Sequence, residues 1–157
     1  MSLMLDVLNK LKELSEANLT DFNRIDIRAI SAIFLSTSND EYPVLYFISN
    51  SESFENVSRG EALHNITFDA IIGTQIFSKE SYCILGEGTS KGIYELSDAF
   101  FDMLNQYPQL DMLVDKRLID ISVTDEGIVL PKVAFQFARR IRMTYGKVED
   151  FKSYKGG

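Results

Sequence analysis

Glycine, lysine and serine occur together in the segment GEGTSKG (86–92), and these residue types are the ones that bind phosphate. A phosphate-binding loop requires four residues between its first glycine and a Gly-Lys-Ser/Thr sequence, so that the lysine and the hydroxyl both reach the phosphates. Here Ser90 precedes Lys91 and Gly92 follows it, so the order of the residues is wrong. We therefore interpret this segment as a loop that leads into a helix, without a nucleotide.

The remaining candidates for chemistry are a single histidine and many carboxylates. His64 is the only histidine, and no acid or nucleophile lies near it in the sequence. Nucleophilic triads and most metal sites need a histidine with partners, so we expect His64 to be a hydrogen-bonded residue of a strand. The carboxylates are numerous enough for an acid pair of the glycosidase kind, but no spacing selects two of them. The sequence predicts no catalytic residues, no metal and no cofactor.

Composition and charge are those of one globular domain. The chain has 157 residues, 45% of them hydrophobic, and a net charge of −7. An acidic balance argues against general nucleic-acid binding, which needs many phosphate-neutralising lysines and arginines. A single cysteine, Cys83, provides neither a disulfide framework nor a metal cluster. It is typical of a reducing compartment, and we expect it to be a small buried hydrophobic residue.

No targeting or membrane segment is expected. The first residues, MSLMLDVLNKLKELSEA, are amphipathic, with charged residues among the apolar ones and no small-residue cleavage site, so they do not have the pattern of a signal peptide. No segment approaches the roughly 18 consecutive apolar residues of a membrane span. The sequence therefore predicts a soluble protein that is made in a cytoplasm.

Hydrophobic periodicity predicts two helices and five strands. Ser2 can cap a first helix, and a second is expected from near Ser90 to just before Pro108. The first helix has an apolar stripe that comprises Met4, Leu5, Val7, Leu8, Leu11 and Leu14. Strands are expected at 25–35, from Pro43 to 49, at 63–77, at 111–123 and at 128–146. Polar loops are expected at 36–41, 50–62 and 78–90, and a hairpin turn at TDEG (124–127).

This order of elements (α-β-β-β-α-β-β) predicts an α+β fold. A single, mainly antiparallel sheet of about five strands would bury one face against the two amphipathic helices. We expect this single domain to span residues 1–146 and to be followed by a polar tail at 147–157.

The segment KVAFQFARRIRMTY (132–145) places arginines along a long strand. Most of its odd-numbered residues are apolar, whereas Arg140 and Arg142 are even-numbered and Arg139 interrupts the apolar set. These arginines could bind carboxylates of a neighbouring subunit, because the planar guanidinium matches a carboxylate. They could equally pair within the chain, with Asp120 or Glu126. The sequence leaves both interpretations open.

The whole layout resembles the tail terminator proteins of tailed bacteriophages, also described as minor tail or head–tail joining proteins. The resemblance covers about residues 3–146 and is one of order and texture, without a defining short motif. It rests on an opening amphipathic helix, a proline-initiated strand after a polar loop, a Ser/Glu-rich excursion before a long strand, a second helix and two closing strands. The corresponding segments are LDVLNKLKEL, EYPVLYFIS, NSESFENVSRGEALHNITFDAIIG, ELSDAFFDMLNQYPQL, KRLIDISVTD and VAFQFARRIRMTYG.

The resemblance implies a structural virion protein and not an enzyme. Such a protein forms a ring, usually a hexamer, that ends the tail tube and joins it to the head connector, and DNA passes through the ring without specific binding. The residues expected to contact ring neighbours are Arg139, Arg140, Arg142, Phe151 and Tyr154. The loop residues expected to contact the tube or the connector are Asn39, Asp40, Glu41, Glu52, Phe54, Glu55, Arg59, Lys79 and Glu80.

Three alternatives stay open at this point. The chain could be another neck or tail component, such as a head-closure or tube protein. It could be an enzyme or small-ligand domain with a pocket between sheet and helices, although the sequence shows no convergent polar groups for one. It could also be a regulatory adaptor that uses its helix faces.

Overall fold

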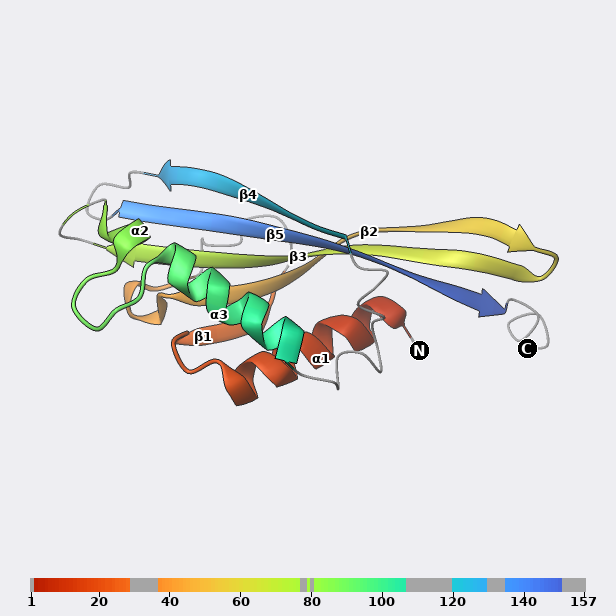
Figure 1. Ribbon diagram of the computed structural model, residues 1–157, viewed down its shortest axis with the longest axis horizontal. Helices are drawn as coiled ribbons and strands as arrows, with labels where there is room; N and C mark the ends of the chain where they lie inside the picture. The colour runs from red at the N-terminus through yellow and green to blue at the C-terminus, as the bar shows by residue number, and fades with distance from the viewer. Residues whose placement is uncertain are drawn as a thin grey trace.

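The computed structural model describes residues 2–28, 37–76, 79, 81–106, 120–129 and 135–150, which form an α+β fold (Figure 1). The predicted fold class is confirmed: one largely antiparallel sheet of five strands carries helices packed against it. The helices are α1 (Leu3–Asn18), α2 (Tyr82–Leu85) and α3 (Ile93–Gln106), with a short 3-10 turn η1 (Asn39–Glu41). The strands are β1 (Arg24–Ile27), β2 (Val44–Ser58), β3 (Glu61–Ile76), β4 (Asp120–Val129) and β5 (Phe135–Asp150).

The strands lie in the order β1-β2-β3-β5-β4. β1 is parallel to β2, and all other neighbouring strands are antiparallel. The edges of the sheet among the described residues are therefore β1 on one side and β4 on the other.

Helices α1 and α3 cover one face of the sheet (Figure 1). α1 begins where the Ser2 hydroxyl accepts a hydrogen bond from the amide of Leu5, as predicted. Leu5 itself is 55% exposed, so its predicted place in the buried stripe is wrong; it lies at the edge of that stripe. The odd-numbered apolar residues of β5 contact this core, and the buried ones are Phe137, Ile141, Met143 and Tyr145.

The predicted loop at 50–62 is wrong, because these residues continue the strands. β2 runs to Ser58, the chain turns at Arg59 and Gly60, and β3 starts at Glu61. Gly60 has a φ of 82°, a conformation that suits glycine. The end of β2, the start of β3 and the end of β5 form a three-stranded arm. It comprises residues 51–58 of β2, 61–67 of β3 and 144–150 of β5. The arm extends well past the helices (Figure 1).

Three other predicted boundaries differ from the structure. The TDEG segment is not a hairpin turn but part of β4, where the pairing shifts by one residue between Asp125 and Gly127. β5 continues to Asp150, so residues 147–150 are strand and not tail. The predicted loop at 78–90 contains the short helix α2. Most of the predicted strands at 25–35 and 111–123 lies outside the described residues.

Candidate functional site

The sheet face opposite the helices carries a buried carboxylate held by two arginines. Asp69 of β3 is fully buried, and its register partner on β5 is Arg142. Arg142 donates through Nε to Oδ1 at 3.0 Å and through Nη2 to Oδ2 at 3.2 Å. Arg140 donates through Nη1 to Oδ2 at 2.7 Å, and Asn50 donates through Nδ2 at 3.4 Å. The carboxylate of Asp69 therefore accepts a bidentate pair of hydrogen bonds from Arg142 and a further hydrogen bond from Arg140.

The electrostatics of this cluster follow from two opposing causes. Burial acts to raise the pKa of Asp69, because it penalises the charged form. The hydrogen bonds from Arg142 and Arg140 act in the other direction and prevail, so the pKa of Asp69 lies below its usual value. The carboxylate is thus ionised at neutral pH and acts as a structural counter-ion.

All three arginines from the sequence analysis therefore pair within the chain, and Arg140 and Arg142 do so with an acid that the sequence did not indicate. Asp69 stands in the apolar segment TFDAII, and an acid among apolar strand residues is the signal that could have revealed it. Arg139 points to the helix side, where it lies 4.6 Å from the ring centre of Tyr94 and 3.1 Å from Asp125. Contact with a ring neighbour stays a prediction for all three.

Of the other predicted interface residues, Phe151 and Tyr154 lie outside the described residues, as does the contact candidate Glu80. The side chains of Asp120, Glu126 and Asn39 also lie outside what the structure describes.

A second polar cluster lies at the β1 edge on the same sheet face. Arg24 pairs with Glu41 of η1 and lies 3.3 Å from Asp26. The Arg28 guanidinium stacks 4.7 Å above the ring of buried Tyr46. The Arg24–Glu41 pair joins the 3-10 turn to the sheet.

Glu41 also accepts hydrogen bonds from the amide and hydroxyl of Ser38. These bonds, together with that from Arg24, lower the pKa of Glu41 to about 2. Glu41 is thus half-buried and engaged within the turn, whereas its neighbour Asp40 is exposed.

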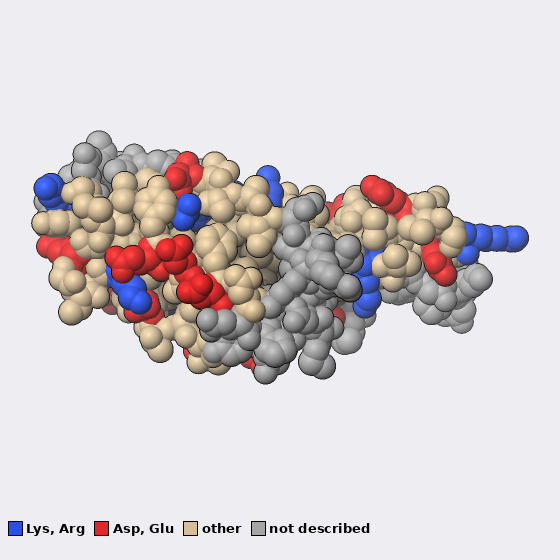
Figure 2. All heavy atoms as spheres, viewed as in Figure 1, with Lys and Arg blue, Asp and Glu red and all other residues tan. Residues whose placement is uncertain are grey.

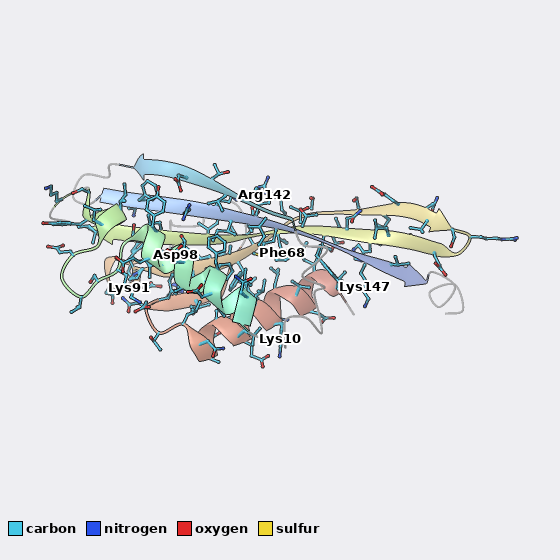
Figure 3. The ribbon with its side chains drawn as sticks, viewed as in Figure 1. Lys10, Phe68, Lys91, Asp98, Arg142 and Lys147 are labelled. Atoms are coloured by element: carbon cyan, nitrogen blue, oxygen red, sulfur yellow. The ribbon has the colours of Figure 1, made fainter. Side chains whose placement is uncertain are left out.

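Four predicted contact residues, Glu52, Phe54, Glu55 and Arg59, come together on the arm. All four are exposed. Phe54 is 53% exposed although its ring stacks on His64 at 4.2 Å. Acidic side chains gather over the helices (Figure 2). Lys147 lies on the arm (Figure 3).

His64 is a buried strand residue, and its strand position is confirmed. The hairpin brings Glu52 to 3.8 Å from its Nε2, a neighbour that the sequence did not predict. This contact does not make a metal site, because the described residues contain no cluster of three or more histidine, cysteine, aspartate or glutamate side chains that could hold one. Cys83 is fully buried, as expected.

Backbone hydrogen bonds within the glycine-rich segment (86–92) hold it in a turn. Glu87 and Ser90 exchange two backbone hydrogen bonds of 3.0 and 2.9 Å. A Cβ on Gly92 would lie 1.9 Å from the carbonyl oxygen of Ile84, so this glycine is required by close packing. Lys91 bonds Asp21 at 2.9 Å. The segment is a turn leading into α3, as interpreted from its residue order.

Two surface hollows occur in the described part of the chain, one along α1 and one between the end of α1 and α3. They are lined by Asn9, Lys12, Glu13, Glu16 and Ala17, and by Asn18, Leu19, Thr20, Asp21, Ala99, Asp102 and Met103. Neither lining includes His64, Cys83 or the Asp69 cluster. No helix among the described residues is long and apolar enough to cross a membrane.

Comparison with known proteins adds no relative. A scan against protein-family models and a search of curated proteins both returned no match.

Proposed function

We propose that this chain is a structural assembly protein of a phage tail or tail-like particle. In this proposal it forms a ring, a hexamer by resemblance to tail terminators, which ends the tail tube and joins it to the head connector. The protein is a virion component of the neck, with copies of itself, the tube protein and the connector as partners. The observation that carries the proposal is the three-stranded arm.

Much of the arm is exposed to solvent. Every β2 residue from Ser49 to Ser58 is exposed, and most of the arm extends past helices α1 and α3 (Figure 1). Val57 and Val148 are 56% and 54% exposed. Exposed apolar side chains on such an extension favour contact with another chain.

The contact candidates also separate into two ends of the molecule. Glu52, Glu55 and Arg59 are on the arm. Asp40 precedes the first residue of β2 and Lys79 follows the last residue of β3, so both lie at the opposite end of these strands. A terminator needs two different contact surfaces, one for the tube and one for the connector, and this separation supports the proposal.

The net charge suits a ring through which DNA passes. At −7 per chain, like charge keeps the DNA from adhering to the protein.

Negative-stain images of the concentrated, purified protein test the proposal. Closed rings of uniform diameter are the expected result. Open-ended tubes of variable length would instead favour a tube protein, because a heterologous contact that does not close produces filaments. A specific stabilisation of the monomer in a ligand thermal-shift screen, without any assembly, would favour a ligand-binding domain.

A further inference from the structure

The two edge strands of the sheet run in opposite directions. β1 is parallel to β2, and the three further steps from β2 to β3, β5 and β4 are each antiparallel. β4 therefore runs opposite to β1. If copies are placed side by side in the same orientation, β4 of one copy meets β1 of the next as an antiparallel pair.

β4 has the features of a strand that accepts a partner. Residues 121–125 are all exposed, with Ile121 at 46% and Val123 at 39%. Residues 120–125, DISVTD, contain neither lysine nor proline, the residues that commonly protect a sheet edge. The register with Met143 and Ile141 places Ile121 and Val123 on the helix side of the sheet.

β1 offers a matching edge. The amide of Arg28 donates to Phe47 of β2, so the neighbouring amide of Ile27 points away from β2. That outward amide donates to the side chain of Asp26 at 2.8 Å. A short local bond of this kind can be exchanged for a strand partner. Ile25 and Ile27 are half-buried at the rim of the helix-side core.

We propose that β4 of one copy pairs with β1 of the next copy and continues the sheet around the ring. In the favoured register Ile121 is opposite Ile27 of the neighbouring copy and Val123 is opposite its Ile25. The inference rests on the proposed self-assembly and names the interface that would produce it.

Other registers are less complementary. A shift of one residue places the apolar side chains of β4 opposite Arg24, Asp26 and Arg28. A shift of two residues in one direction places Val123 opposite Asn23, before the start of β1. The same shift in the other direction places Asp125 opposite Ile25. Only the favoured register pairs both Ile121 and Val123 with the two isoleucines of β1.

This geometry has a consequence for the arms. The contact is heterologous, so it closes into a ring when the rotation between copies allows it. Because every copy then has the same orientation, all arms project from one face of the ring. The opposite face carries the ends that contain Asp40 and Lys79.

A cysteine cross-linking experiment tests the register. Ile25→Cys with Val123→Cys places the two thiols directly opposite each other across the proposed interface. Ile27→Cys with Val123→Cys is the matched control, offset by two residues. The wild-type protein controls for the buried Cys83. Each variant is oxidised at ring-forming concentration and the covalent species are separated by denaturing electrophoresis.

The proposal predicts a ladder of linked subunits for the first pair. Its yield should exceed that of the offset control by about tenfold, because a disulfide needs Cβ atoms about 3.5–4.5 Å apart. Rings in which neither pair links would overturn the proposed interface and leave the proposed function intact. Absence of rings in the wild-type protein would count against the proposed function itself. Equal linking of both pairs would overturn the register.

Discussion

Removal of the two arginines that hold Asp69 is expected to destabilise the fold strongly. In the variant Arg140→Met with Arg142→Met, the fully buried carboxylate of Asp69 loses its arginine hydrogen bonds and keeps the 3.4 Å contact with Asn50. Breaking a buried ion pair by removing one side costs about 3–5 kcal/mol, since the remaining charge is left buried. We expect a loss of this size in the free energy of unfolding, measured by urea denaturation at pH 7.

The single variants and a rescue variant make this prediction specific. Arg142→Met removes two of the three arginine bonds to Asp69, and Arg140→Met removes one. A hydrogen bond to a charged group contributes about 1.5–3 kcal/mol to stability. The side chain of Arg142 is 44% exposed, so solvent reduces the contribution of its bonds. Adding Asp69→Leu to the double variant removes the buried charge and should restore most of the stability.

A double variant within about 0.5 kcal/mol of wild type, the range of ordinary surface substitutions, would refute this account of Asp69. So would a triple variant that is less stable than the double variant. The same reasoning predicts that Arg140→Glu with Arg142→Glu unfolds the protein, because it places two acids beside a buried third. That substitution is therefore unsuitable for testing a ring interface.

Three further predictions concern the effect of pH on stability, the packing of Gly92 and the exposure of the arm. The pKa values of Asp69 and Glu41 are both lowered in the folded protein, so their contribution to stability is present above their unfolded values near pH 4. The thermal midpoint should fall as the pH is lowered from about 4.5 towards 2, and Asp69→Asn should flatten that fall. Gly92→Ala should lower the free energy of unfolding, measured in urea, because the new methyl group would collide with the backbone of Ile84; an unchanged value would contradict the close packing. Trypsin should cut the free protein first after Arg59, at the tip of the arm, and protection of that bond in assembled particles would show that the arm is covered.

The elements with a clear period could be predicted from the sequence. The buried positions of α1 and the helix-facing residues of β5 follow from spacings of three to four and of two. These patterns arise because one face of each element is buried and the other is not. Leu5 has the spacing of a buried residue but lies at the edge of the stripe and is 55% exposed.

The arm could not be predicted in this way. Its β2 segment is exposed at every position, so no alternation marks it as a strand, and its serines, asparagines and glutamates resemble a loop. The arm is held by the pairing of β2 with β3 and of β3 with β5, which the sequence does not display. The shift at TDEG has a similar origin: a glycine after an acid is typical of a turn, but here it follows a bulge within β4.

The pairing of Asp69 with its two arginines could also not be predicted from the sequence. Arg140 and Arg142 are 71 and 73 residues from their partner, and only the antiparallel register of β3 and β5 brings them together. The sequence could supply the arginines and their common face, but the choice among many carboxylates depended on strand order.

The native mass of the wild-type protein over a concentration series shows whether this chain closes into a ring with copies of itself. We expect one dominant closed species at high concentration, with the mass of a hexamer, in equilibrium with monomer on dilution. A protein that stays monomeric throughout the series, or that grows without reaching a fixed mass, would contradict it.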